Sequence, residues 1–200
     1  LSGNMGEMSW GNVLCPWSEC YGDVDDHFGL FGGDVKTIMA HCVWSGEEET
    51  ERLRERGVYV AHCPQSNTNL SSGIAPVRRY LDQGLKVGLG TDVAGGSSAS
   101  VFRAMADAIQ VSKLRSRLQD ESLKPLTFTE AFYLGTKGGG SFFGKVGSFE
   151  ADYEFDALVL NDSGLRHPQP LSLQERLERF IYLADERHIE AKYVAGKKVF

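Results

Sequence analysis

Short apolar runs alternate with amphipathic and polar stretches through the first two thirds of the chain. Three of these runs are rich in β-forming residues and predict buried strands at 35–41, 58–63 and 86–92. Helical periodicity follows them and predicts helices at 47–56, 74–84 and 101–118. Strands that alternate with helices are typical of crossover connections, which bury parallel strands on both faces. The pattern therefore predicts an α/β fold with a parallel sheet.

Turn-forming residues punctuate this pattern. Gly57 follows a helix whose acidic residues come early and whose arginines come late, so we expect it to end that helix. Pro, Asn, Ser and Gly crowd the stretch PQSNTNLSSG at 64–73, which predicts a polar loop. The stretch AGGSSAS at 94–100 predicts a second loop before the long helix.

The last third of the chain carries a different pattern. Thr127 with Glu130 is a capping pair, and it predicts a helix that runs to the glycines at 138–140. We expect a strand at 154–161, a helix at 171–183 and two short strands within 189–200, around a turn near Gly196. This tail predicts a small β element packed on the main body. Residues 1–34 give no clear pattern, although WGNVLCPW is compatible with a helix start.

Composition and charge argue against several classes of function. The 200 residues are 42% hydrophobic and 24% charged, which favours a packed core over disorder. A net charge of −6 argues against a nucleic-acid surface, since phosphate binding needs clustered Lys and Arg. We find neither an apolar run of the roughly 18 residues that a membrane helix needs nor a signal-peptide pattern. Four cysteines are too few for a disulfide scaffold, so we expect a cytoplasmic protein without membrane or nucleic-acid partners.

Three ionisable residues fall near the ends of the predicted parallel strands. His41, His62 and Asp92 lie at or near carboxyl ends, where parallel sheets bind their ligands. A carboxylate at the end of a buried strand is costly without a partner, so Asp92 either meets a metal or a histidine or caps the turn that follows. His62 alone is typical of a hydrogen-bonded strand-end histidine. We expect the remaining histidines at the surface: His27, His167 and His188.

The two His-Cys pairs at 41–42 and 62–63 raise the question of a shared metal. Neighbouring residues of a strand point to opposite faces, so the two residues of one His-Cys pair do not easily coordinate the same ion. No C-x-x-C spacing is present, and the H-x-E with P-C-x-x-C signature of nucleoside deaminases is missing. A structural zinc knot is therefore disfavoured. We interpret Cys42 and Cys63 as small buried residues that pack the strands rather than as catalytic nucleophiles.

Several longer motifs resemble those of a known family. AHC at 40–42, AHCPQSN followed by SSG from 61, and GLGTDVAGG at 88–96 are similar to the amidohydrolase superfamily, in its branch of purine and related ring deaminases. GTDVAGG before a helix with Ser112 and Lys113 resembles the guanine deaminases in particular. So do LTFTEAFYLGT at 126–136 and RFIYLADERHIEAKYVAGKKV at 179–199. The similarity covers nearly the whole chain.

The resemblance implies a fold and a reaction. The fold is α/β, the carboxyl-terminal part of a TIM-like (β/α)8 barrel, with about strands six to eight and their helices in residues 1–145. Residues 146–200 would then carry a helix and the short strands of a small β-sandwich. The implied reaction is zinc-dependent hydrolysis of guanine, a small purine substrate, to xanthine and ammonia. Iron is an alternative metal, and the full enzyme would be a homodimer.

The same resemblance implies roles for individual residues. Asp92 matches the metal ligand that also acts as base, and we expect it to touch the substrate. His41 matches the residue that hydrogen-bonds the attacking water or the substrate. His62, Ser66 and Asn67 belong to the HCPxSN motif, which we interpret as loop support.

The chain also departs from the family pattern. It has no H-x-H pair, and the family's fifth-strand histidine would precede Leu1. Gly3 stands where the family has a proton-shuttling glutamate, and Asp152 with Tyr153 stands where it usually has Gly-Lys. A catalytic zinc takes three protein ligands, so we expect the other ligands upstream of this chain and no activity of the segment alone. The alternatives are another amidohydrolase, such as an adenosine-derivative deaminase or a chlorohydrolase, and an inactive fragment or pseudoenzyme.

Overall fold

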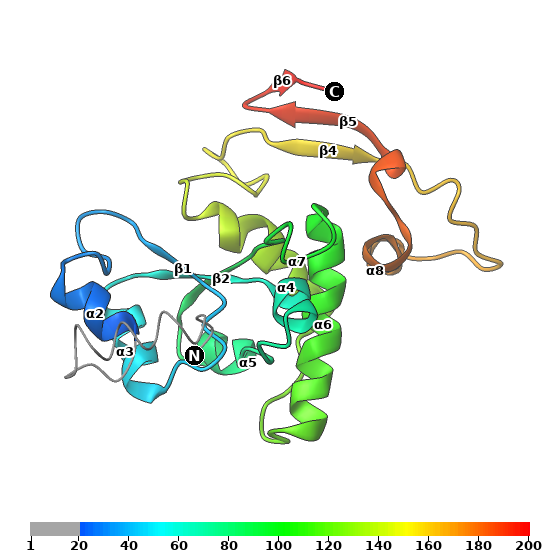
Figure 1. The fold of residues 1–200 in the computed structure, drawn as a ribbon. Coiled ribbons are helices and arrows are strands. Elements are labelled where there is room, and N and C mark those ends of the chain that lie inside the picture. Colours follow the sequence, from blue (N-terminus) through cyan, green and yellow to red (C-terminus); the bar gives the residue numbers. More distant parts are fainter. Residues whose placement is uncertain (1–20) are drawn as a thin grey trace.

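The computed structural model describes residues 21–200 and contains two small sheets (Figure 1). The first sheet is parallel, and its strands are β1 (Ile38–Ala40), β2 (Tyr59–His62) and β3 (Lys86–Leu89). β2 is the central strand and pairs with both neighbours, with Ala40 beside Ala61 and His62 beside Leu89. The predicted parallel strands are confirmed, although each is shorter than its apolar run.

Helices connect the parallel strands as the pattern predicts. α3 (Glu47–Glu55) joins β1 to β2, α4 (Pro64–Asn69) and α5 (Val77–Asp82) join β2 to β3, and α6 (Val101–Leu118) follows β3. Gly57 takes a left-handed φ of +66° just after α3, where a larger residue would be strained, and so ends that helix. The prediction of a loop throughout 64–73 is wrong, because Pro64 occupies the first turn of α4, where its fixed φ suits a helix start.

A further helix, α2 (Tyr21–His27), precedes the parallel sheet and packs on α3. The Gly22 amide donates to the buried carboxylate of Glu49 at 3.2 Å. Arg56 pairs with Asp26 at 2.9 Å. These polar contacts attach α2 to α3 and to the residue that follows it.

The hydrophobic core fills the space between the parallel sheet and its helices. Val60 of β2 belongs to one buried cluster with Leu53 of α3, Tyr80 of α5 and Met105 of α6. Burial of a large apolar side chain contributes roughly 1.5–3 kcal/mol, so this layer holds the strand ends in place. The Tyr80 hydroxyl also donates to the Cys42 carbonyl and thereby fixes the segment that follows β1.

After α6 the chain forms α7 (Phe128–Tyr133) and runs on into a π-helical turn, η1 (Leu134–Gly138). The predicted capping box is confirmed, since the side chains of Thr127 and Glu130 each bond the other's backbone amide. Gly139 follows η1 and lies against β3: a Cβ built on Gly88 would stand 2.8 Å from the Gly139 Cα. Glycine allows the two backbones to approach this closely, so the end of η1 covers β3 directly.

The second sheet is antiparallel and consists of β4 (Ala157–Leu160), β5 (Ile189–Val194) and β6 (Lys197–Lys198). α8 (Leu173–Leu183) and the short 3-10 helix η2 (Glu186–His188) connect β4 to β5. α8 packs on α6, where the rings of Phe102 and Phe180 lie 5.1 Å apart. The predicted short strands around Gly196 are confirmed, and Figure 1 shows this sheet at one end of the molecule. The barrel, the sandwich and the boundary between residues 145 and 146 stay predictions.

Several predictions concern residues 1–20, which lie outside the described residues. They concern the family's fifth-strand motif near Leu1, Gly3 in place of the family's glutamate, the helix start in WGNVLCPW, and the cysteines Cys15 and Cys20. Between residues 21 and 200, the structure contains no helix that is both long and apolar enough to cross a membrane.

Candidate active site

The three candidate residues lie at the carboxyl edge of the parallel sheet. His62 is the last residue of β2, His41 directly follows β1, and Asp92 comes shortly after the last residue of β3. Because the strands are parallel, these ends meet at one edge of the sheet, where α/β proteins place their ligand sites.

The chain leaves the sheet through strained backbone at His41 and at Asp92. The Cys42 amide donates to the Ala40 carbonyl at 2.9 Å and closes a three-residue turn centred on His41. The φ angles are +69° at His41, +47° at Cys42 and +47° at Asp92, a region that costs non-glycine residues about 1–3 kcal/mol. Such strain clusters at functional sites. The prediction that His41 and Cys42 alternate across a strand is wrong, because both residues follow β1.

His41 and Asp92 face each other across this edge. Nε2 of His41 lies 3.8 Å from Oδ2 of Asp92, and the two side chains are 26% and 41% exposed. The pair is therefore accessible to water and to small molecules. An imidazole and a carboxylate at this spacing can accept hydrogen bonds from, or exchange a proton with, a molecule placed between them.

α4 contacts this pair from the middle of the sheet. The Ser66 hydroxyl donates to Oδ2 of Asp92 at 2.6 Å, and Oδ1 of Asn67 lies 2.8 Å from Nδ1 of His41. Both Ser66 and Asn67 are buried. The sequence predicted loop support for these two residues. In the structure their side chains lie on the candidate catalytic residues themselves.

Other residues of α4 contact the loop that follows Asp92. The side-chain oxygen of Gln65 accepts from the amides of Ser97 and Ser98 at 2.9 Å and 3.0 Å. Asn69 donates from Nδ2 to the Gly95 carbonyl at 2.8 Å. Sequence reasoning missed Gln65 and Asn69, because it interpreted the whole of 64–73 as a loop. The usable signal was the proline directly after the second His-Cys pair, since helices often begin at such a residue.

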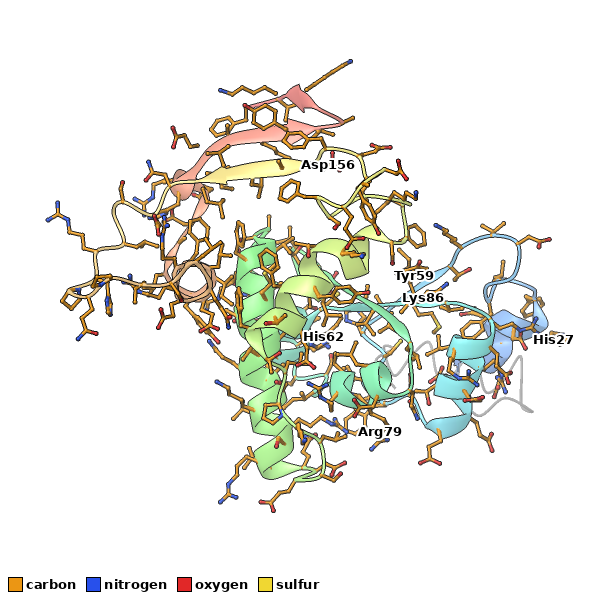
Figure 2. The ribbon with its side chains drawn as sticks, turned by 180° about the vertical axis from the view of Figure 1, so that it is seen from behind. His27, Tyr59, His62, Arg79, Lys86 and Asp156 are labelled. Carbon is orange, nitrogen blue, oxygen red and sulfur yellow. The ribbon has the colours of Figure 1, made fainter. Side chains whose placement is uncertain are left out.

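His62 differs from His41, although both follow an alanine. Its side chain is 1% exposed, Figure 2 shows it in the interior, and its Nδ1 has no hydrogen-bond partner among the described residues. Burial, with a smaller contribution from the nearby His41, lowers the pKa of His62 to about 4. The imidazole is therefore neutral near pH 7. The expectation of a hydrogen-bonded strand-end histidine is not met at Nδ1.

The thiols next to both histidines are buried as well. Burial raises the pKa of Cys42 to about 12 and that of Cys63 to about 11. Thiols with such pKa values are protonated near pH 7 and are poor nucleophiles. Their environment favours a packing role over a catalytic one.

The other three histidines lie away from this edge. His27 and His167 are exposed, as predicted. The prediction of a surface position is wrong for His188, which is half-buried. Its ring packs edge-on against Phe180 at 5.9 Å, and its Nδ1 lies 3.2 Å from Oδ1 of Asp185.

A metal ion at the carboxyl edge would find two candidate donors, Asp92 and His41. Throughout residues 21–200, the structure groups no three His, Cys, Asp or Glu side chains in a way that could hold a metal ion. Catalytic zinc sites use three protein ligands and keep one open position. The described residues thus fit part of such a site and do not complete it.

Comparison with known proteins identifies the family. Residues 18–199 match the amidohydrolase family. The chain belongs to this family. This amidohydrolase is 40% identical to guanine deaminase from Mus musculus over 210 residues, a region that covers 100% of this chain and 46% of the mouse protein.

A solved structure and a second enzyme class extend the comparison. Guanine deaminase from C. acetobutylicum, solved with guanine bound in its active site, is similar with a TM-score of 0.93 and 50% identity. That match covers 100% of this amidohydrolase and 47% of the other chain. The 5'-deoxyadenosine deaminase of Methanopyrus kandleri is 34% identical over 176 residues, 87% of this chain and 39% of that protein. The chain spans about half the length of the guanine deaminases it matches.

Proposed function

We propose that this chain is part of a guanine deaminase, which hydrolyses guanine to xanthine and ammonia. The observation that carries the proposal is the His41–Asp92 pair, 3.8 Å apart at the carboxyl edge of a parallel sheet. Similarity to guanine deaminases along the whole chain supports it. Because the chain spans about half of their length, the activity belongs to the complete enzyme.

In that enzyme Asp92 is a metal ligand and the base that takes a proton from the attacking water. His41 hydrogen-bonds the water or the substrate through Nε2, the ring nitrogen on the side of Asp92. A bound zinc ion would supply acidity, since it lowers the pKa of its water to about 7; iron is the alternative metal. The remaining ligands lie outside residues 21–200, because the described residues complete no such site.

The test joins this chain to the half of the enzyme that it lacks. The part of the C. acetobutylicum enzyme that this chain does not match is fused ahead of Leu1, a choice favoured by the 50% identity of the matched part. Xanthine formation and bound zinc are measured for the fusion, for an Asp92→Asn fusion and for the 200-residue chain alone. We expect deamination by the unmodified fusion only. Stoichiometric zinc in the chain alone would contradict the assignment of the missing ligands.

A deaminase of adenosine derivatives is the first alternative, because the Methanopyrus kandleri enzyme matches 87% of the chain. A chlorohydrolase is the second. The same fusion is therefore assayed with 5'-deoxyadenosine and with a chlorinated triazine. Faster turnover of either compound than of guanine would contradict the proposed substrate.

An inactive pseudoenzyme is the alternative that Gly3 favours. The family resemblance places a proton-shuttling glutamate at this position, and loss of an acid-base group lowers rates by about 10²–10⁴-fold. The fusion is therefore also made with Gly3→Glu. A rise in rate of orders of magnitude would identify the glycine as the cause of low activity. A normal rate without the change would mean that another group moves the proton.

Two further properties of the complete enzyme are proposed from the family resemblance. They are a homodimeric assembly and a cytoplasmic location. The molecular mass of the fusion in light scattering tests the first, and fractionation of cells that express it tests the second.

A further inference from the structure

Two consecutive side chains of α4 contact the two candidate catalytic residues. β2 lies between β1 and β3, and α4 begins shortly after β2. From this central place Asn67 reaches His41 beyond β1, and Ser66 reaches Asp92 beyond β3. The short helix α4 thus sets the position of His41 relative to Asp92.

Burial confines both of these side chains. Ser66 is 0% and Asn67 is 2% exposed, whereas the histidine and the aspartate that they contact are partly open. The Asn67 backbone is also held, since its amide donates to the Cys63 carbonyl at 3.0 Å and its carbonyl accepts from Ser72 at 2.8 Å. A side chain packed in this way has few alternative rotamers, so it can orient a more exposed partner.

The contact between Asn67 and His41 selects a tautomer of the imidazole. An amide oxygen accepts hydrogen bonds and cannot donate, so Oδ1 at 2.8 Å from Nδ1 requires a proton on Nδ1. In the neutral ring Nε2 then carries the lone pair, and it faces Oδ2 of Asp92 at 3.8 Å. Two acceptors at this distance share no hydrogen bond. Both are therefore available to a donor that enters between them.

We propose that Asn67 is a positioning residue that holds His41 in the Nδ1–H tautomer, so that Nε2 of His41 and Oδ2 of Asp92 together accept from one water or substrate N–H. Ser66 orients the carboxylate by donating to Oδ2, which leaves Oδ1 for another partner. The use of this arrangement in catalysis rests on the proposed deaminase function. The assignment of the His41 tautomer is independent of that function.

The first experiment measures the tautomer directly. The protein is labelled with 15N-histidine, and the ring nitrogens of His41 are assigned by comparison with His41→Gln. Spectra are recorded in mildly alkaline buffer, where histidine is neutral. We expect a protonated Nδ1 and an unprotonated Nε2. A predominant Nε2–H form would overturn the proposal, because Asn67 would then donate to His41 through its amide nitrogen.

Variants of α4 separate positioning from packing. Asn67→Leu removes the acceptor, and we expect the Nε2–H form of His41 to become populated. Asn67→Asp keeps an acceptor at the same place and should retain Nδ1–H. Asn69→Leu is the matched control, since it removes a hydrogen bond of the same helix to Gly95 and should leave the His41 spectrum unchanged. An unchanged tautomer in folded Asn67→Leu would overturn the proposal, and if that variant does not fold, the spectrum of the unmodified protein decides.

Kinetics of the complete enzyme then test the catalytic use. Loss of a group that orients a metal-bound histidine typically costs about 10–100-fold in activity. We expect a fall in kcat of the same order for Asn67→Leu, with KM little changed. Asn67→Asp should restore most of the rate. If the enzyme shows Nδ1–H on His41 but no guanine deamination, the proposed function fails and the positioning role stands. If it deaminates guanine with an Nε2–H ring on His41, the positioning role fails and the proposed function stands.

Discussion

The tripeptide Ala-His-Cys occurs at the end of β1 and again at the end of β2, and its two copies have different surroundings. At residues 40–42 the histidine lies in a left-handed turn, is partly exposed and faces Asp92. At residues 61–63 the histidine is the last residue of β2 and is buried, with its pKa lowered to about 4. The first copy can act on a ligand, whereas the second belongs to the core.

The point at which each strand ends explains this difference. Ala40 and Ala61 lie side by side, so the two copies share one register in the sheet. β1 stops at Ala40, while β2 continues through His62, which pairs with Leu89 of β3. Strand pairing keeps a side chain in the packed sheet, and a turn exposes it at the open edge. An identical short motif therefore has no fixed role until its strand pairing is known.

The largest expected effect comes from removal of the exposed histidine. In the guanine deaminase proposed above, His41→Ala should lower the rate of xanthine formation by about 10²–10⁴-fold, because the proposed role makes His41 an acid-base or hydrogen-bonding group of the reaction. Its free energy of unfolding, measured in urea, should change by less than about 1 kcal/mol, because the side chain is partly exposed. His62→Gln is the control. An equal loss of rate in well-folded His62→Gln would contradict the assignment of the active copy.

Removal of the buried histidine should affect stability instead. His62→Ala leaves a cavity beside the core and should lower the free energy of unfolding by about 2–4 kcal/mol. The urea midpoints of His62→Ala and His41→Ala are compared directly. Equal midpoints would show that burial does not distinguish the two copies.

Acid should destabilise the protein through His62. Its pKa is 6.5 when unfolded and about 4 when folded, so between these values the unfolded state binds more protons and stability falls as pH falls. The expected loss from this group between pH 7 and pH 5 is about 2 kcal/mol. Urea unfolding at both pH values measures it, with His62→Gln as the reference. A variant with the same pH dependence as the unmodified protein would refute the role of His62.

The smallest expected difference concerns the two thiols. Cys42 and Cys63 should both react slowly with a thiol reagent in the native protein, since burial raises both pKa values. The thiolate fraction at equal pH should be higher for Cys63, because burial raises its pKa to about 11 and that of Cys42 to about 12. Mass spectrometry of labelled peptides, with Cys15 and Cys20 replaced by serine, measures the rates. Faster labelling of Cys42 would reverse the expected order.

Much of the fold was predictable because its signals are local. The apolar runs predicted the strands, and the glycine after α3 and the Thr127–Glu130 pair predicted a helix end and a helix start. α4 was missed because its residues are individually typical of turns, and the constraint that favours a helix comes from Pro64 and from packing. The lengths of the strands were overestimated for a different reason: hydrophobicity does not show where the pairing between strands stops.

The amino-acid sequence alone predicts the alternation of strands and helices and the parallel sheet. It also predicts that three ionisable residues lie near the carboxyl ends of the strands: His41, His62 and Asp92. The division of roles between the two His-Cys pairs does not follow from it. That division depends on the turn at His41 and on the bonds of Ser66 and Asn67, each of which joins residues 26 positions apart. Local patterns report which segments bury apolar surface, whereas contacts between distant residues form only when neighbouring strands bring their ends together.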